Sequence, residues 1–146
     1  MPTEVCNILL TRAPLEAPPL ANLTEAGAII DFWGVVRLHE AGAEIAGLEY
    51  EAHAAMAEYQ LRSLASEAAA RFQVTETLIH HRIGFVGVGE PSLLVRVASR
   101  HRAAAFEAGQ WVVDELKKRV PIWKHPRQER PGDSLPRADS AVTGAL

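Results

Sequence analysis

The sequence predicts a single α+β domain with an antiparallel or mixed sheet and two main helices. Apolar runs rich in β-branched residues, separated by short turns, indicate the strands. Two longer segments have apolar residues three and four positions apart, which is the periodicity of amphipathic helices. The chain has 146 residues, of which 48% are hydrophobic, so it can bury one sizeable core. Strands combined with two helices in this way are typical of the α+β class.

The first half of the chain contains three predicted strands. Residues 4–11 form an apolar first strand, and a linker with several prolines follows it. Residues 28–37 are an apolar run that predicts a buried strand ending on Arg37. Residues 38–42 then predict a polar turn, and residues 45–51 predict a further strand.

The second half begins with a helix predicted over residues 53–72. Its expected buried stripe consists of Ala57, Leu61, Leu64, Ala68 and Phe72. Residues 75–83 alternate as a strand, residues 84–91 form a glycine-rich turn, and residues 92–99 form another strand.

Residues 99–124 combine the end of a strand, a long helix and an exit stopped by a proline. Ser99 is expected to cap this helix, and Pro121 is expected to end it at the preceding residue. The apolar stripe of the helix consists of Ala105, Gly109, Val112, Val113, Leu116 and Val120.

Three basic residues, Arg100, His101 and Arg102, lie at the N-terminus of this helix, where the helix dipole disfavours cations. They indicate either a bound anion or a solvated basic turn. His101 and Lys117 are sixteen residues apart, which corresponds to about 24 Å along a continuous helix. One small ligand therefore cannot contact both residues of the same chain. Either they serve different sites, or a symmetric dimer brings them together.

The composition argues against several functional classes. A net charge of −3 argues against broad nucleic-acid binding, which requires a basic surface. We expect no signal peptide, because the N-terminus has no positive residues before an apolar run. We expect no membrane span, because no apolar run is long enough to cross a bilayer. The single cysteine, Cys6, excludes an internal disulfide and is typical of a reducing, cytoplasmic compartment. Within its apolar strand, Cys6 is expected to be a small core residue rather than a nucleophile.

Neither a metal nor another cofactor is predicted. His80 and His81 are adjacent on a predicted strand, so they point to opposite faces and cannot bind the same ion. The glycines Gly84, Gly87 and Gly89 precede a strand rather than a helix, so they do not form a phosphate-binding loop.

The remaining candidates for chemistry are basic residues, namely Arg37, His101, Arg102, Lys117, Arg119 and Lys124. Lysines near a helix C-terminus normally complement the helix dipole, which explains Lys118. Lys117 borders the apolar stripe, where partial burial would favour a neutral, reactive amine. Arg37 carries the forked guanidinium that suits phosphate.

Six short motifs resemble those of the molybdopterin synthase large, catalytic subunit family. They are FWGVVR (32–37), LEYEAHAAMAE (48–58), HRIG (81–84), GVGE (87–90), SRHRAAAFEAG (99–109) and LKKRVPIWK (116–124). The resemblance implies one domain over residues 1–124 with an α/β-hammerhead fold. Residues 125–146 are expected to form a flexible, proline-rich tail.

The resemblance implies a sulfurtransferase of molybdenum cofactor biosynthesis. Family members add two sulfurs to cyclic pyranopterin monophosphate and so make the dithiolene of molybdopterin. The sulfur arrives as a thiocarboxylate on the C-terminal Gly-Gly end of a small ubiquitin-like subunit, in a heterotetramer built on a homodimer of large subunits. The first alternative is a non-catalytic homologue, a scaffold that binds the ubiquitin-like partner or a pterin phosphate. The second is a plain phosphate-binding module.

The resemblance also implies roles for individual residues. Lys117 and Lys124 match the catalytic lysines, and Lys117 matches the one closest to the incoming thiocarboxylate. The implied substrate-binding residues are Arg37, His101 and Arg102, of which the last two come from the neighbouring subunit. The implied supporting residues are Phe32, Met56 and Arg119. After Lys124 the family usually continues with a basic–acidic pair and a tryptophan-containing segment, whereas this chain continues with a proline-rich stretch without tryptophan.

Overall fold

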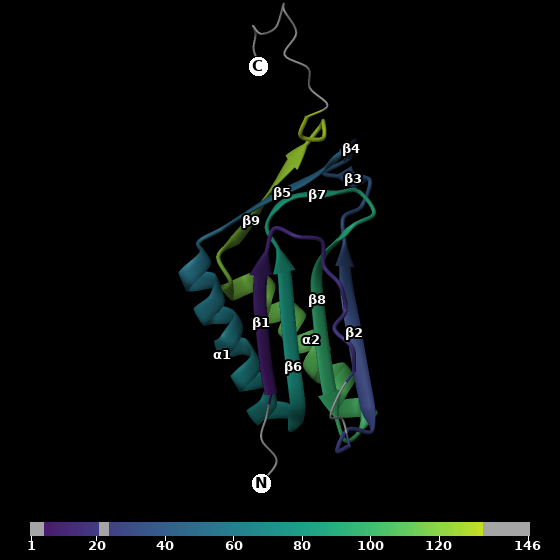
Figure 1. Ribbon diagram of the computed structural model, residues 1–146, viewed down its shortest axis with the longest axis vertical. Coiled ribbons are helices and arrows are strands. Elements are labelled where there is room, and N and C mark those ends of the chain that lie inside the picture. Colours follow the sequence, from purple (N-terminus) through teal and green to yellow (C-terminus); the bar gives the residue numbers. More distant parts are fainter. Residues whose placement is uncertain (1–4, 21–23, 133–146) are drawn as a thin grey trace, which may run out of the picture.

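The computed structural model describes residues 5–20 and 24–132. In chain order the elements are β1 (Val5–Thr11), β2 (Ala28–Val35), β3 (His39–Glu40), β4 (Ala43–Glu44), β5 (Gly47–Ala52), α1 (Ala54–Phe72), β6 (Val74–Arg82), β7 (Gly84–Gly87), β8 (Pro91–Ser99), α2 (Arg102–Arg119) and β9 (Ile122–Arg127). In this described part, strands and two helices form the α+β architecture that the sequence predicted (Figure 1). The main sheet is mixed, because β1 and β6 are parallel and its other pairs are antiparallel.

Both helices cover one face of the main sheet, whose strand order is β1-β6-β8-β2 (Figure 1). α1 packs over β1 and β6, while α2 packs over β8 and β2. The core between these layers includes the fully buried side chains of Leu61, Leu64, Ile79, Val95 and Val112. The helix stripes predicted from periodicity are confirmed, since every position is buried except Phe72 and Val113, which are half-buried.

The opposite face of the main sheet is crossed by the linker that follows β1 (Figure 1). Leu15 of this linker is buried against the sheet. Arg96 of β8 donates to both carboxylate oxygens of Asp31 on β2, through Nε at 2.7 Å and Nη2 at 2.9 Å. Arg96 Nη1 also donates to the Pro18 carbonyl at 2.8 Å. This buried arginine therefore ties the linker to the sheet.

A second, smaller sheet lies beyond one end of the main sheet (Figure 1). Its central strand is β5, which pairs antiparallel with β7 on one side and β9 on the other. Val36, Ile45, Leu48 and Val86 form the buried cluster of this end of the molecule. The short hairpin of β3 and β4 lies at the same end (Figure 1).

The helix ends have local causes. α1 begins after His53, whose Nδ1 accepts a hydrogen bond from the Met56 N–H at 3.3 Å. It ends at Gln73, which adopts the left-handed conformation with a φ of 57°. α2 ends at Val120, immediately before Pro121, as predicted.

The predicted cap of α2 is wrong. Ser99 is the last residue of β8 and is buried, because the strand keeps its pairing with β2 as far as this residue. His101 takes the N-cap position instead, and its side chain makes no capping hydrogen bond. Among the described residues, no side chain therefore caps the first N–H groups of α2.

The strand predicted at residues 28–37 is shorter and more exposed than expected. β2 ends at Val35, so Arg37 lies beyond it. Phe32, Trp33 and Val35 are exposed, because β2 is an edge strand that pairs with β8 alone. An apolar run predicts a strand but does not show how many neighbours the strand has.

Two predicted turns contain strands. The turn predicted at residues 38–42 includes β3, and the chain reverses at Ala41 and Gly42, which have positive φ values of 53° and 83°. This is the usual backbone of a two-residue hairpin loop. The turn predicted at residues 84–91 begins with β7, because residues 84–87 pair with β5.

Cys6 and the C-terminal boundary also differ from expectation. Cys6 is exposed rather than buried in the core, because β1 is an edge strand. β9 continues to Arg127, so residues 125–127 belong to the small sheet rather than to a flexible tail. Residues 133–146 of the predicted tail lie outside the described residues. Within the described part, no helix is long and apolar enough to cross a membrane.

Candidate active site

A pocket of about 330 Å³ lies where the two sheets meet the end of α2. Its apolar lining consists of Phe32, Gly34, Leu93, Leu116, Val120 and Ile122. Its polar lining consists of Tyr50, His81, Ser92, Lys117 and Lys124. β2, β5, β6, β8, α2 and β9 all contribute residues, so the pocket forms only in the folded chain.

Strand pairing places the lining residues side by side. Across the main sheet, Leu93 of β8 is opposite Gly34 of β2 and His81 of β6. Across the small sheet, Tyr50 of β5 is opposite Lys124 of β9. The rings of Tyr50 and His81 meet edge to face, with centroids 5.1 Å apart. This aromatic contact connects the main sheet to the small sheet at the pocket.

The two predicted catalytic lysines reach the pocket from different elements. Lys117 lies in the last turn of α2, and Lys124 lies in β9, after the bend at Pro121. Lys117 is exposed, so the partial burial expected from its place beside the stripe is absent in the single chain. The Lys124 ammonium forms an ion pair with Glu40, with Nζ 2.9 Å from Oε2. Two ammonium groups beside a pocket of mixed polar and apolar lining can bind and stabilise an anion.

His81 is a buried polar group in the pocket wall. Its Nδ1 lies 2.8 Å from the Arg82 carbonyl oxygen, which can only accept, so Nδ1 carries the proton and donates. Burial lowers the pKa of His81, although the hydrogen bond to the Arg82 carbonyl acts in the opposite direction. A neutral imidazole in this tautomer keeps Nε2 as a hydrogen-bond acceptor.

Five predicted site residues, among them Arg119, do not line the pocket of their own chain. His101 and Arg102 lie at the start of α2, at the opposite end from Lys117 (Figure 1). α2 runs between them without a break, which confirms the premise of the distance argument. Arg37 is exposed beyond β2, and Met56 is exposed in the first turn of α1. Phe32 is the supporting residue that does line the pocket.

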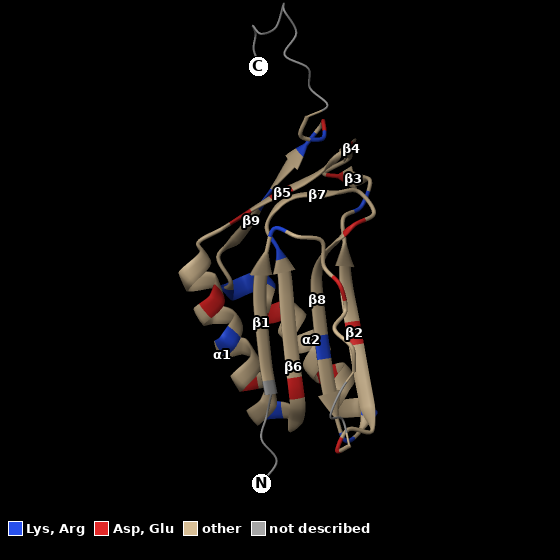
Figure 2. Ribbon diagram, in the orientation of Figure 1, with Lys and Arg blue, Asp and Glu red and all other residues tan. Residues whose placement is uncertain are grey.

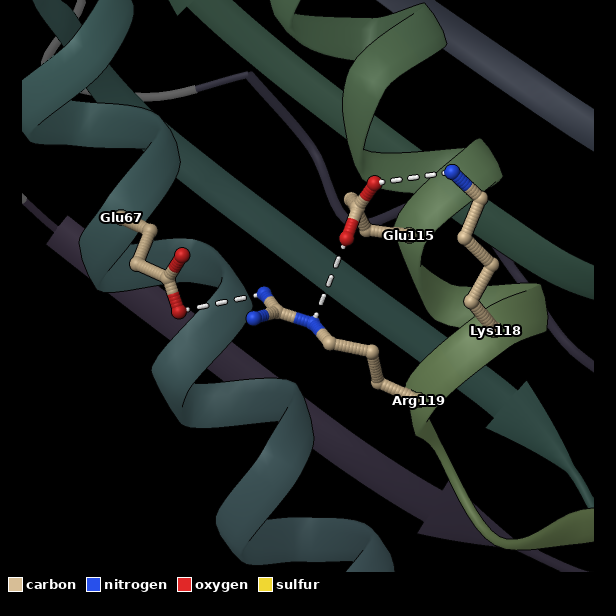
Figure 3. Close-up of polar contacts among 4 residues, drawn as sticks. All are labelled: Glu67, Glu115, Lys118 and Arg119. Carbon is tan, nitrogen blue, oxygen red and sulfur yellow. Dashed lines mark hydrogen bonds and ion pairs between the residues drawn. The ribbon is translucent and has the colours of Figure 1, made fainter.

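Arg119 connects the two helices. Figure 3 shows its guanidinium between them, with Nη2 3.1 Å from Glu67 Oε2 on α1 and Nε 3.5 Å from Glu115 Oε1 on α2. Glu115 also pairs with Lys118, whose Nζ is 3.3 Å away (Figure 3). These contacts support a packing role for Arg119 and the ordinary surface role expected for Lys118.

A larger hollow of about 430 Å³ shares Tyr50 with the candidate pocket. Its lining includes Arg12, Arg127 and a paired His125 and Glu51, with Nε2 and Oε1 3.1 Å apart. It contains none of the predicted site residues. The smaller pocket, which gathers both lysines, is therefore the candidate active site.

The charges of the molecule are mixed in sign. Both helices carry acidic as well as basic residues (Figure 2). Across residues 5–20 and 24–132, no group of three or more His, Cys, Asp or Glu side chains is arranged to hold a metal ion. The pocket lining itself offers two lysine amines and several neutral polar groups.

Comparison with known proteins identifies the family. The family model described as MoaE protein matches residues 10–119. The chain belongs to the MoaE protein family. A molybdopterin synthase catalytic subunit from Thermoplasma volcanium is 41% identical over 111 residues, which cover 76% of this chain and 81% of that relative.

Solved structures agree with this membership of the MoaE family. The X-ray crystal structure of molybdopterin synthase from Staphylococcus aureus matches with a TM-score of 0.73 and 30% identity, covering 84% of this chain and 90% of that chain. A protein–protein complex of subunits 1 and 2 of molybdopterin-converting factor from Helicobacter pylori matches with a TM-score of 0.63 and 22% identity. That match covers 83% of both chains and shows the shared fold alone.

Three polar pocket residues of this MoaE-family chain, Tyr50, His81 and Ser92, are not among the site residues predicted from the sequence, where His81 is weighed only as a metal ligand. Tyr50 and His81 each lie within one of the motifs that resemble the family, and this is the feature of the sequence that could have indicated a role for them. Their place in the pocket depends on pairings between strands that are distant in sequence. Local periodicity contains no information about such pairings.

Proposed function

We propose that this chain is the catalytic subunit of a molybdopterin synthase and acts in molybdenum cofactor biosynthesis. It transfers sulfur from the C-terminal thiocarboxylate of a small ubiquitin-like subunit to cyclic pyranopterin monophosphate. Membership of the MoaE family supports this activity. The observation that carries it is the convergence of Lys117 and Lys124, from α2 and β9, on one pocket. We propose a cytoplasmic location, in agreement with the single cysteine.

The pocket suits the chemistry of this reaction. A thiocarboxylate is already activated, so the enzyme must supply position and charge stabilisation more than a nucleophile of its own. Lys117 is an exposed ammonium at the pocket edge, and we assign it contact with the incoming thiocarboxylate. Lys124 is assigned to stabilise the anionic intermediate or to donate a proton to it. The volume of about 330 Å³ is in the range of small-molecule sites.

The substrate phosphate requires further cations, which we propose come from a second copy of the chain. Arg37, His101 and Arg102 are the proposed phosphate- and pterin-binding residues. None of them lines the pocket of its own chain, and the last two lie a full helix length from Lys117. A symmetric dimer would bring one subunit's His101 and Arg102 to the other's Lys117. The small sulfur-carrier subunit then completes a heterotetramer.

The role of Lys117 is tested by comparing Lys117→Ala with Lys118→Ala. Both lysines are exposed in the last turn of α2, but Lys118 pairs with Glu115 and does not line the pocket. We expect Lys117→Ala to lower kcat/KM by about 10²–10³-fold, because the incoming thiocarboxylate loses a charge-stabilising donor. Lys118→Ala should retain activity.

The assay mixes the purified full chain with thiocarboxylated small subunit and cyclic pyranopterin monophosphate, and measures molybdopterin as its fluorescent oxidation product. Wild-type protein that binds the small subunit but makes no product would contradict the proposed activity and favour the scaffold alternative. Equal activity of the Lys117→Ala and Lys118→Ala variants would refute only the role assigned to Lys117. The proposed activity of the chain would stand.

A further inference from the structure

The two pocket lysines differ in their charge partners. Lys124 Nζ lies 2.9 Å from Glu40 Oε2, and the Glu40 side chain is only 21% exposed. Lys117, in contrast, makes neither an ion pair nor a hydrogen bond with any residue that the structure describes. The pocket edge therefore carries one ammonium with a counter-charge and one without.

Glu40 is presented by a well-anchored element. It belongs to β3 of the β3–β4 hairpin, which turns at Ala41 and Gly42. The two ends of this hairpin are held by buried side chains, Val36 before it and Ile45 after it, which are 3% and 5% exposed. The Ile45 N–H also donates to the Leu38 carbonyl at 2.9 Å and closes the base of the hairpin. The Glu40 carboxylate is thus attached to a backbone fixed by packing.

Lys124 needs such a partner because its own environment restrains it little. Its side chain is 52% exposed, and a lysine has four rotatable bonds that let an unpaired ammonium occupy many positions. A fixed carboxylate restricts this set to conformations near one point at the edge of the pocket. Displacement of a reacting group by about 1 Å can change a rate by up to 10²-fold.

We propose that Glu40 is a positioning residue, which holds the Lys124 ammonium in place for the sulfur-transfer reaction. This inference rests on the proposed function. The ion pair gives the two lysines different roles. Lys117, without a carboxylate partner, remains available to bind an incoming anion. Lys124, already paired, acts as an oriented donor rather than as an anchor for the substrate.

The kinetic test compares Glu40→Gln with Glu44→Gln in the synthase assay. Glu44 lies on the same hairpin but is exposed, and its Oε2 is 4.0 Å from Nε2 of the exposed His39, so it is a matched control. We expect Glu40→Gln to lower kcat about tenfold while the KM values for both substrates stay unchanged. Glu44→Gln should behave as wild type. A gain of activity in Glu40→Gln would overturn the proposal, because it would mean that the pair restrains Lys124 from reacting.

A double variant separates positioning from structural support. If Glu40 acts through Lys124, adding Glu40→Gln to Lys124→Ala should cause no further loss in single-turnover product formation. A further loss equal to that of Glu40→Gln in the wild-type background would overturn the proposal. It would show that Glu40 supports the fold or another group.

Amine labelling gives a readout that does not depend on activity. The full chain is treated with a small acylating reagent, and modification of Lys124 and Lys117 is followed by mass spectrometry. We expect faster acylation of Lys124 in Glu40→Gln, with Lys117 unchanged as the internal reference, and no change in Glu44→Gln. Unchanged Lys124 labelling would overturn the ion pair itself. A different result would be a wild-type chain without synthase activity, together with faster Lys124 labelling in Glu40→Gln. That result would contradict the proposed function but support the ion pair between Glu40 and Lys124.

Discussion

His81 is the residue at which the two sheets meet, and its burial has a consequence for stability. It contacts Tyr50 of the small sheet and is opposite Leu93 in the main sheet. Because burial lowers its pKa below the ordinary value of 6.5, the folded chain resists protonation of this ring. The unfolded chain does not, so it binds more protons as the pH falls below about 6.5.

This difference predicts a pH-dependent stability. The free energy of unfolding should fall as the pH is lowered from about 6.5 toward the depressed pKa of His81, and His81 should not affect it above that range. In His81→Asn, whose amide can still donate to the Arg82 carbonyl but does not titrate, this slope should shrink by at most about 1.4 kcal/mol per pH unit. Urea unfolding at pH 8, 6 and 5 measures both slopes. If the wild type and His81→Asn had the same slope below pH 6.5, His81 would not be the source of the pH dependence.

At the scale of a single element, α1 ends at a residue with a left-handed backbone conformation. Gln73 closes the helix in the left-handed region, with its N–H 3.0 Å from the Ala69 carbonyl. Glycine adopts this conformation without a Cβ penalty, whereas glutamine is strained there. The position is exposed, so a substitution changes little else.

Glycine should therefore have opposite effects at two exposed glutamines. Gln73→Gly should raise the free energy of unfolding by about 0.5–1 kcal/mol, because it relieves the left-handed strain. Gln110→Gly, in the interior of α2, should lower it by about 1 kcal/mol through loss of helix propensity. Thermal and urea unfolding of both variants measures the two changes. A destabilised Gln73→Gly would show that the glutamine side chain makes a compensating contribution.

At the scale of the whole molecule, we propose a site that combines groups from two chains. Lys117 and Arg102 lie at opposite ends of one helix, so a single chain holds only part of the proposed cation set at its pocket. In a symmetric dimer, each site would use Lys117 of one subunit and Arg102 of the other.

Mixed dimers test this arrangement. A heterodimer of a Lys117→Ala chain and an Arg102→Ala chain should contain one intact site and show about half of the wild-type activity, although each homodimer is impaired. A chain with both substitutions, paired with a wild-type chain, should be nearly inactive, because each site then lacks one group. Differently tagged chains allow both heterodimers to be purified. The reverse pattern, with activity only in the second heterodimer, would place both groups in the same chain's site.

Much of the fold was predictable because it has local causes. The two helices follow from apolar periodicity, and α2 ends where Pro121 forbids its continuation. The errors share a different cause. Cys6 and β2 are exposed because their strands lie at the edges of the main sheet, and residues 84–87 and 125–127 become strands because β5 pairs with both. Strand order is a long-range property that alternation within one run does not contain.

By itself, the sequence determined the fold class, the two helices, the distance between the ends of α2 and, through its motifs, the resemblance to a family that the comparisons confirm. Only the tertiary structure decided that Lys117 and Lys124 share a pocket, that Tyr50 and His81 form its wall, and that Glu40 pairs with Lys124. The physical reason is that helix periodicity and caps act between residues a few positions apart. A pocket lined by six elements depends instead on strand pairings and side-chain contacts between distant parts of the chain.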